Sequence, residues 1–558
     1  MSDHITSATQ ACKTHQVRNQ PAPLENYNAF SSDSVLQDAV MLYGAGAFKK
    51  RLLSYGEIAG SEILELGFQA NEHPPVLRTH DRYGHRIDRV EFHPAYHRLM
   101  SLGIEHGLVN LTWSGQAGAR VARSALMYLH NQFEAGTMCP ITMTHAAVPA
   151  LRIDTDLAAD WEPLIRSNQY DPEFAPWREK KGLTVGMAMT EKQGGSDVRA
   201  NSTRAQPLDS TDTGQAYTLV GHKWFCSAPM SDAFLSLAQT DSGLSCFLVP
   251  RFRPDGSLNA IRIQRLKSKL GNRSNASSEI EYDQAWARRL GQPGRGVATI
   301  IRMVAETRLD CAIGSAALIR QAVAQALDHC RQRKAFEQPL IEQPLMKNVL
   351  ADLAIESEAA LHFSLYLARL FEQSEHDQTS ALIARIATPI AKYWVCKRAV
   401  AVINEAQECL GGAGYVEEFI VPRLYREAPV NAIWEGSGNI QCLDVLRAVT
   451  RDSQVLDALS DWLRPHCALP GLSNRLDRAR RLIGASATAA ANSRRITEDL
   501  ALIIQAAILA EANSPIADLF AATRLEHPHG YFLGALPAHD ELSAVVERAM
   551  PHTNNKIR

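Results

Sequence analysis

The sequence predicts a mainly helical α+β protein: a helical N-terminal region, a middle antiparallel β-domain, a helical bundle and a helical C-terminal extension. Two observations predict this order. Short apolar and β-branched runs separated by turn residues fill residues 181–292, as in strands. Long segments with apolar residues at helical spacing fill residues 293–450. The 558 residues are also enough for several domains.

The first zone, residues 1–180, begins with an extended arm at Asn19–Pro23 that has no periodicity. Segments such as Tyr96–Glu105 and Ala119–Phe133 then have a helix-compatible composition, with proline and glycine between them. We expect an N-terminal arm followed by a helical domain.

The second zone has the turn-rich pattern of a small barrel or sandwich. We expect strands at Thr184–Thr190, Ala216–Phe225, Phe234–Gln239, Leu244–Val249, Ile261–Gln264 and Ser278–Asp283. Ile280 and Tyr282 alternate with acidic residues, which is the period of a half-buried strand. No segment between these strands is long enough for a crossover helix, so a Rossmann domain is not expected.

The third zone, residues 293–450, contains three apolar stripes with helical spacing. They are Val297, Ile300, Ile301 and Val304; Leu345, Val349 and Leu353; and Ile383, Ile386, Ile390 and Trp394. Gly411-Gly412 supplies a helix stop, and long helices with short connections predict a bundle. The last zone, 451–558, is rich in alanine and is also expected to be helical.

Composition excludes several classes of protein. The net charge of −2 gives no bulk attraction to nucleic acid, so any basic surface must be local. The ten cysteines form no metal-binding or C-x-x-C pattern, so we expect no metal and reduced, buried thiols in a cytoplasmic protein. We see no signal peptide and no apolar run that could cross a membrane.

Two stretches of the β-domain offer groups to a ligand. After Thr190, a Gly-Gly turn that includes Gly195 leads to Ser196, so that backbone N–H groups and hydroxyls can contact a polar ligand. A structural turn explains the same spacing equally well. Trp224 lies at a strand end with Ser227 just beyond it, and the pair can cover a flat ring. The alternative is an aromatic strand in the core.

The third stretch is Ile433–Ile440, which precedes a predicted helix. Ser437 or Asn439 can cap that helix, and a helix N-terminus favours an anion. Glu435 follows Trp434, and an apolar setting would raise the pKa of its carboxyl and suit it to proton abstraction. An exposed loop glutamate is the alternative.

Together these motifs resemble the acyl-CoA dehydrogenase superfamily, over roughly residues 40–450. The T-E-x-x-x-G-S-D loop matches Thr190–Asp197, and the [YW]-E-G-[TS] element matches Trp434–Ser437. The W-x-[TS] strand matches at Trp224 and Ser227 with one extra residue between them. Arg333–Phe336 is similar to R-x-x-F, and Gln407–Gly412 to Q-x-x-G-G. The resemblance implies a helical domain, a β-domain and a four-helix bundle, in that order.

The resemblance also implies FAD between the β-domain and the bundle, with Glu435 as the base that removes a proton from an acyl-CoA. The residues implied at the cofactor are Thr190, Gly195, Ser196, Trp224, Ser227, Arg333, Phe336, Gln407, Gly411, Gly436, Ser437 and Asn439. Arg333 and Phe336 would reach the flavin of a neighbouring subunit, which implies a dimer or a homotetramer. Glu337 replaces a usual glycine, and Thr307 stands where isovaleryl-type enzymes carry their base.

Several stretches, among them Leu270–Ser277 and Leu424–Asn431, are similar to the AidB branch of the superfamily. That branch implies binding to double-stranded DNA, a role in the response to DNA alkylation and at most weak dehydrogenase activity. Candidate phosphate contacts are Arg447, Arg475, Arg478, Arg481, Arg494 and Arg495, although a solvated helix face would have the same pattern. The alternative is a metabolic acyl-CoA dehydrogenase of the isovaleryl or another short or branched-chain type.

Overall fold

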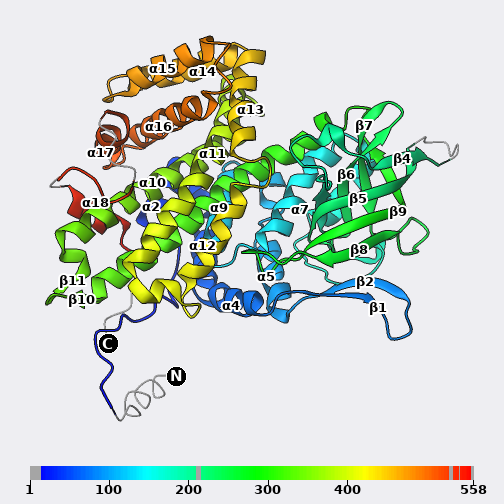
Figure 1. The fold of residues 1–558 in the computed structure, drawn as a ribbon, viewed down its shortest axis with the longest axis horizontal. Coiled ribbons are helices and arrows are strands. Elements are labelled where there is room, and N and C mark those ends of the chain that lie inside the picture. Colours follow the sequence, from blue (N-terminus) through cyan, green and yellow to red (C-terminus); the bar gives the residue numbers. More distant parts are fainter. Residues whose placement is uncertain (1–13, 209–214, 527–531, 539–540, 554–558) are drawn as a thin grey trace.

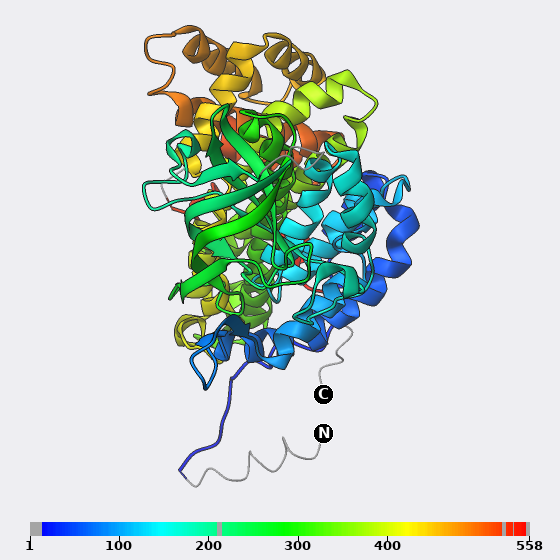
Figure 2. The same ribbon diagram turned by 90° about the vertical axis from the view of Figure 1, so that its right-hand side faces the viewer.

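The computed structural model describes residues 14–208, 215–526, 532–538 and 541–553. It has the predicted architecture. The β-domain lies at one end, the long helices α9, α10 and α11 run diagonally through the centre, and the helices of the extension cover one side of them (Figure 1). The view turned by 90° places the β-domain in front of the bundle, with the extension above (Figure 2).

The N-terminal zone is helical except for one hairpin. Its helices are α2 (Ser34–Leu42), α3 (Lys49–Ile58), α4 (Leu64–Glu72), α5 (Pro94–Glu105), α6 (Ala119–Asn131), α7 (Met138–Leu151) and α8 (Thr155–Ile165). The hairpin of β1 (Val76–His80) and β2 (Arg86–Glu91) was not predicted. Charged residues interrupt the apolar positions of both strands, so neither strand has the clean alternation of a half-buried strand.

The β-domain contains the six predicted strands and one more. They are β3 (Val185–Ala188), β4 (Arg204–Pro207), β5 (Ala216–Ser227), β6 (Ala233–Thr240), β7 (Gly243–Pro250), β8 (Ile261–Leu266) and β9 (Ser277–Leu290). The unpredicted β4 has one buried residue, Ala205, and therefore no apolar pattern. Pairing is antiparallel except that β6 runs parallel to β3 and β4, a correction to the purely antiparallel prediction.

The bundle consists of α9 (Gly296–Gln332), α10 (Pro344–Gln373) and α11 (Gln378–Cys409), with α12 (Ile420–Asn431) and α13 (Gly438–Arg451) packed against α11. The stripe along α11 is buried as expected, apart from the half-buried Trp394. The first turns of α9 and α10 differ from the predicted buried stripes, because Val297, Ile301 and Leu345 are exposed. The start of α9 packs against β7 on its other side, where Gly296 and Ile300 are buried.

The extension is packed onto the bundle and shares its apolar core. It contains α14 (Gln454–Leu463), α15 (Leu472–Gly484), α16 (Ser493–Glu511), α17 (Ala517–Phe520) and α18 (Leu542–Ala549). Arg524 donates to Glu356 of α10 at 3.0 Å, and Arg548 donates to Glu358 of the same helix at 3.0 Å. Removal of the extension would therefore uncover buried charge as well as apolar surface.

Among the described residues, no helix is both long and apolar enough to cross a membrane. Nine cysteines lie in the described part of the chain as free thiols, and all of them are buried except Cys467. Cys12 lies outside the described residues. No group of three or more potential ligand side chains in the described ranges could hold a metal ion.

Candidate functional site

Glu435 lies in the tight turn between α12 and α13. Its backbone φ is +57°, a left-handed conformation that is strained for a residue other than glycine, and Gly436 follows with φ +99°. Three side chains hold the turn. Arg308 Nε and Gln441 Nε2 donate to the Glu435 carbonyl at 3.1 and 3.0 Å. Lys392 Nζ donates to the carbonyls on either side of Glu435, both at 2.7 Å.

The Glu435 carboxylate accepts a hydrogen bond of 2.7 Å from Thr307 Oγ1. Burial raises the pKa of Glu435 above its ordinary value, and the bond from Thr307 and the nearby Lys392 and Arg308 oppose that rise. The direction agrees with the prediction. Thr307, which stands where isovaleryl-type enzymes carry their base, is thus a direct partner of the Glu435 carboxylate.

The N-terminus of α13 differs from the prediction. Ser437 is the N-cap residue, but its side chain makes no capping hydrogen bond. Asn439 lies inside the first turn of the helix, and its Oδ1 accepts from Arg494 Nε at 2.9 Å. Neither side chain satisfies the first N–H groups of the helix, so this end keeps its preference for an anion.

Trp224 and Ser227 lie at the end of β5, where the strand contains a β-bulge. Lys223 pairs with Ile280 and Cys226 with Ser278, so three steps along β5 correspond to two along β9. The bulge absorbs the extra residue between Trp224 and Ser227. Cys226 therefore points into the β-core, and Ser227 is half-buried opposite Ser277.

The loop after Thr190 and the strand end at Trp224 are joined by a backbone hydrogen bond of 2.8 Å from Trp224 N to Thr190 O. The next residue, Glu191, is fully buried and pairs with Lys223 at 2.8 Å. Burial opposes the charge of Glu191, but Lys223 and further hydrogen bonds lower the pKa of this carboxyl to about 2. Glu191 therefore anchors the loop, and Gly195 and Ser196 are exposed beyond it.

Helix α7 connects the β-domain to Glu435. The Cys139 thiol lies within electrostatic range of Lys269 and Glu435, and the Ser227 hydroxyl acts to lower its pKa. Burial raises the pKa of Cys139 to about 12, so the thiol stays protonated at neutral pH. The Ser227 hydroxyl of the β-domain and the Glu435 carboxylate thus lie near the same buried thiol, Cys139. The sequence analysis did not predict a role for Cys139.

The remaining cofactor candidates lie at the far end of the bundle. The hairpin of β10 (Lys334–Ala335) and β11 (Gln338–Pro339) follows α9, whose 37 residues span roughly 55 Å. Phe336 at its tip is 92% exposed, and both turn residues, Phe336 and Glu337, have positive φ. Arg333 donates to the carbonyl of Asn19 in the N-terminal arm.

Gln407 and Gly411 lie at the same end of the bundle. Gln407 Nε2 donates to Gly414 O at 2.7 Å, and Gly411 has φ +60° just after α11. The thiol of Cys330 near the end of α9 contacts the carbonyl of Cys409 at the end of α11. Within one chain, this group is well separated from Glu435, because Gln407 lies 15 residues, roughly 22 Å, along α11 from Lys392, which holds the Glu435 turn.

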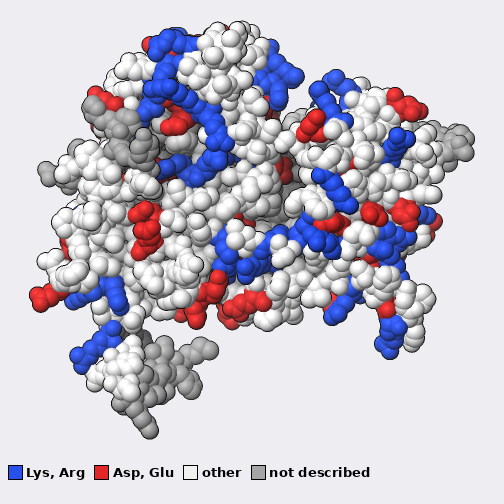
Figure 3. Space-filling view, in the orientation of Figure 1, with Lys and Arg blue, Asp and Glu red and all other residues white. Residues whose placement is uncertain are grey.

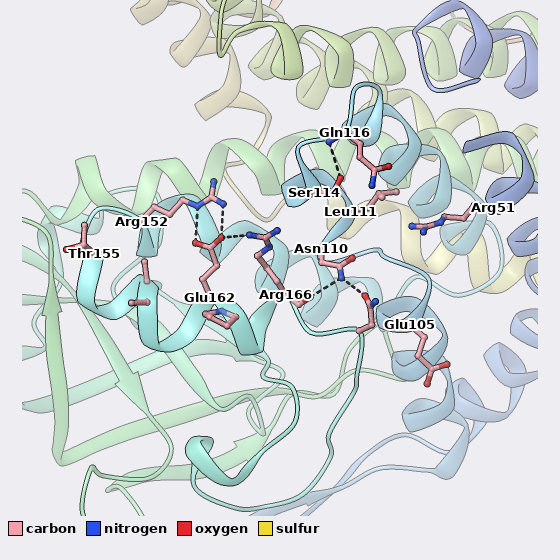
Figure 4. A pocket seen from close by; sticks show the side chains of 14 residues that line it. Arg51, Glu105, Asn110, Leu111, Ser114, Gln116, Arg152, Thr155, Glu162 and Arg166 are labelled. Atoms are coloured by element: carbon pink, nitrogen blue, oxygen red, sulfur yellow. Dashed lines mark hydrogen bonds and ion pairs between the residues drawn. The ribbon is translucent and has the colours of Figure 1, made fainter. Parts of the chain in front are cut away.

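Two cavities in the described part of the chain bear on the site. The larger, about 790 Å³, lies among α3, α5 and α8, where Arg152 and Arg166 both bind Glu162 (Figure 4). No candidate site residue lines it. The smaller, about 510 Å³, is lined by Pro140 and Ala228, the chain neighbours of Cys139 and Ser227, and by aromatic side chains including Tyr96 and Tyr170. The smaller cavity therefore adjoins the candidate site.

The candidate arginines fall into two groups. Arg475 is buried, donates to Asp499 at 2.8 Å and also donates to two backbone carbonyls of the extension. It is structural and does not fit a phosphate contact, which corrects the prediction. Arg478 donates to the same carboxylate and is 35% exposed. Arg447, Arg481, Arg494 and Arg495 are exposed, with Arg447 3.3 Å from Asp444.

The site fits a flat cofactor with polar edges. Lys267 Nζ lies 3.1 Å from the centre of the Trp224 ring and covers one face of the indole, so a stacked ligand would take the opposite face. Beside Glu435, Trp434 Nε1 and Gln441 Oε1 are buried and have no hydrogen-bond partner within the described ranges. Unsatisfied buried donors and acceptors at one place are typical of a ligand site.

Three family models match successive parts of the chain: the N-terminal domain of the adaptive response protein AidB at residues 19–172, the acyl-CoA dehydrogenase middle domain at 186–285 and its C-terminal domain at 294–450. AidB of Escherichia coli (strain K12) is 47% identical over 95% of this chain and 98% of its own length. Acyl-CoA dehydrogenase family member 11 of Caenorhabditis elegans is 34% identical over 73% of this chain and 67% of its own.

Two solved structures have the same fold over most of the chain. The apo form of Bd2924 has a TM-score of 0.82 and 32% identity, and covers 88% of this chain and 99% of its own. ACDH-11 of Caenorhabditis elegans, in complex with C11-CoA, has a TM-score of 0.83 and 26% identity, with coverages of 99% and 95%. With three family models matched in succession and 47% identity to AidB over nearly its whole length, this chain belongs to the AidB branch of the acyl-CoA dehydrogenase family.

Proposed function

We propose that this protein is an FAD-containing flavoprotein that binds double-stranded DNA with little sequence specificity and takes part in the response to DNA alkylation. In this proposal its acyl-CoA dehydrogenase activity is weak at most. The observation that carries the DNA part is the surface of the extension, where exposed arginines gather over α13, α15 and α16 (Figure 3).

FAD supplies the redox chemistry when it is bound, by accepting a hydride at the flavin ring. Trp224 and Ser227 would hold the flavin ring, and Thr190 with the exposed Gly195 and Ser196 would hold the phosphates. Gly436 and Ser437 complete the site at the N-terminus of α13, where the helix favours the negative charge of the cofactor.

Arg333, Phe336, Gln407 and Gly411 would complete the cofactor site of a second copy, because the bundle separates them from Trp224 in their own chain. An aromatic side chain that is 92% exposed on a strained hairpin favours a position at a subunit interface. We therefore propose a homotetramer, a dimer of dimers, in the cytoplasm.

Glu435 is placed to take a proton. Burial raises the pKa of its carboxyl, and the bond from Thr307 and the charges of Lys392 and Arg308 oppose that rise. A substrate carbonyl beside the turn can accept the Glu435 N–H, which would stabilise negative charge that develops on the oxygen. The fixed backbone of the turn keeps that donor in place without further reorganisation.

The exposed arginines of α13, α15 and α16 form what we call the extension patch: Arg447, Arg480, Arg481, Arg494 and Arg495. Guanidinium groups on neighbouring helices contact successive phosphates without reading bases, which predicts low sequence specificity. The chain as a whole is close to neutral, so this local charge must provide the attraction.

Duplex binding of the full chain tests the proposal. Arg481→Glu with Arg495→Glu is expected to weaken binding and to reduce the slope of log K against log salt by about two, since each phosphate contact contributes about 0.9. Arg82→Glu, at the exposed turn of the β1–β2 hairpin, makes the same kind of charge change elsewhere and serves as the control. Wild-type binding that does not respond to salt would refute the phosphate contacts.

A metabolic acyl-CoA dehydrogenase is the second candidate. It is favoured by the retained base, with its raised pKa, and by the C11-CoA complex of ACDH-11, a protein similar along 99% of this chain. Rapid bleaching of bound FAD by one of a panel of acyl-CoAs, lost in Glu435→Gln, would support this function. Slow bleaching by every member, together with salt-sensitive duplex binding, would support the first function.

A further inference from the structure

Lys269 lies in the segment between β8 and β9 and is half-buried. Its Nζ donates to Asn275 O at 2.8 Å and to Ser277 Oγ at 3.1 Å. An ammonium group has three donors and no acceptor, so Ser277 Oγ must accept this bond. The positive charge of Lys269 is therefore directed at the hydroxyl of Ser277.

The carboxylates that face Lys269 are held by other groups. Glu134, after α6, accepts the hydroxyl of Ser274 at 2.6 Å and backbone N–H groups of its own turn. Glu427, on α12, accepts the backbone N–H of Asn272 at 2.5 Å and its side-chain amide at 2.7 Å. Both lie within electrostatic range of Lys269, as does the Cys139 thiol on α7. Lys269 has no direct ion pair within the described ranges.

Ser277 lies directly opposite Ser227 on the neighbouring strand, and the two hydroxyl oxygens are 3.2 Å apart. Either hydroxyl could donate if the pair stood alone. Because Ser277 Oγ already accepts from Lys269, its own proton is free to point to Ser227 Oγ. A hydroxyl oxygen can accept two hydrogen bonds, so Lys269 does not block a bond from Ser227 to Ser277. The ammonium charge instead repels the Ser277 proton, which favours donation from Ser277 to Ser227 and leaves the Ser227 proton for a ligand.

We propose that Lys269 is a positioning residue that, through Ser277, fixes Ser227 as a hydrogen-bond donor to the flavin and raises the flavin's midpoint potential. The proposal rests on the proposed function, because it requires FAD at Ser227. Reduction places negative charge on the flavin ring. A donor at its edge and a cation behind that donor both stabilise the reduced state more than the oxidised state.

Burial lowers the pKa of Lys269 to about 8, so this group loses its proton within an accessible pH range. A neutral amine can accept a hydrogen bond, and the direction of the Lys269–Ser277–Ser227 chain is then no longer fixed. The midpoint potential should therefore show an additional decrease as the pH rises through about 8. The Cys139 thiol, with a pKa of about 12, does not titrate there.

The test is the midpoint potential of FAD bound to the full chain, measured from about pH 6 to about pH 9, across the Lys269 pKa. Lys269→Met is expected to lower the potential at neutral pH by about 30 mV or more, a tenfold change in the ratio of reduced to oxidised flavin. It should also remove the decrease near pH 8. Ser277→Ala keeps the charge of Lys269 but removes the hydroxyl that links it to Ser227, so a smaller lowering of the midpoint potential is expected.

Two further variants complete the design. In the double variant of Lys269→Met with Ser277→Ala, the effects should not add, because both act through one chain of hydrogen bonds. The control is Lys347→Met, which removes a lysine 3.7 Å from Glu342 at the start of α10. It should leave the potential unchanged.

FAD-bound Lys269→Met with a wild-type potential and wild-type pH profile would overturn the proposal. If this variant does not fold, Ser277→Ala decides, and an unchanged potential in that variant would overturn the proposal equally. A wild-type chain that binds no FAD would overturn the proposed function and this inference together. Normal FAD binding with unchanged potentials would overturn the inference alone.

Discussion

The hydrogen bond from Thr307 to Glu435 offers a direct test of what sets the pKa of the proposed base. Thr307→Val replaces a buried hydroxyl by a methyl group of similar size, so the turn should keep its conformation. A hydrogen bond to a charged group contributes about 1.5 to 3 kcal/mol. The same hydroxyl also lies 3.1 Å from Val304 O, so its proton is shared and the lower value applies. At about 1.4 kcal/mol for each pKa unit, the pKa of Glu435 should rise by about one unit.

The sign of this effect is fixed by the role of the group. Glu435 accepts a proton only when it is ionised, so the rate falls as the pH decreases through its pKa. In Thr307→Val, this acid limb should move about one unit toward higher pH. The measurement is the single-turnover rate of FAD bleaching by an acyl-CoA against pH. Thr307→Ser keeps the hydroxyl and should keep the wild-type profile.

A second readout does not depend on activity. Infrared titration detects the protonated carboxyl of Glu435, and the band is assigned by its loss in Glu435→Gln. An apparent pKa in Thr307→Val that equals the wild-type value, or lies below it, would refute the reasoning. Such a result would mean that burial and the neighbouring cations alone set the charge of this base.

Three other predictions concern assembly and stability. Phe336→Ala should leave the free energy of unfolding of a subunit almost unchanged, because the ring is 92% exposed. It should weaken FAD retention, and it should weaken oligomer formation in sedimentation experiments. Unchanged assembly would contradict the proposed interface. Arg475→Ala should destabilise the chain by about 3 to 5 kcal/mol in chemical denaturation, since it leaves Asp499 buried without one of its partners; a loss below about 1 kcal/mol would contradict a buried pair. Burial opposes ionisation of Glu306, but Arg120 and His145 lower its pKa to about 2. The ionised carboxylate therefore stabilises the fold above about pH 4.5, and this stabilisation is lost as the pH falls toward 2. Glu306→Gln should flatten the profile of Tm against pH in this range.

The order of the domains could be predicted from the sequence because periodicity reports burial along each segment. The strands around Ile280 and Tyr282 and the helix through Ile383, Ile386 and Ile390 have the expected buried faces. The β1–β2 hairpin and β4 could not be predicted, because their stability comes from neighbouring strands and not from an apolar pattern of their own.

The candidate site was predicted in part. Trp224, Ser227 and Glu435 follow from local motifs. Their supporting residues do not, since Thr307, Lys392 and Gln441 come from three helices and meet only when the bundle is packed. Lys392 lies next to an apolar helical stripe, and a buried lysine in such a position is the one local signal that could have indicated it.

The extension shows the limit of counting charges along a chain. Four arginines of the extension look equivalent in the sequence. Arg475 and Arg478 form ion pairs with Asp499, whereas Arg481 and Arg495 are exposed. The sequence by itself determined the fold family and the order of its motifs, because short-range patterns and residue types are sufficient for these. Only the tertiary structure decided which arginines are exposed, which side chains contact Glu435 and which cofactor candidates lie away from it. Burial and hydrogen-bond partners depend on contacts between segments far apart in the chain, and no local pattern contains them.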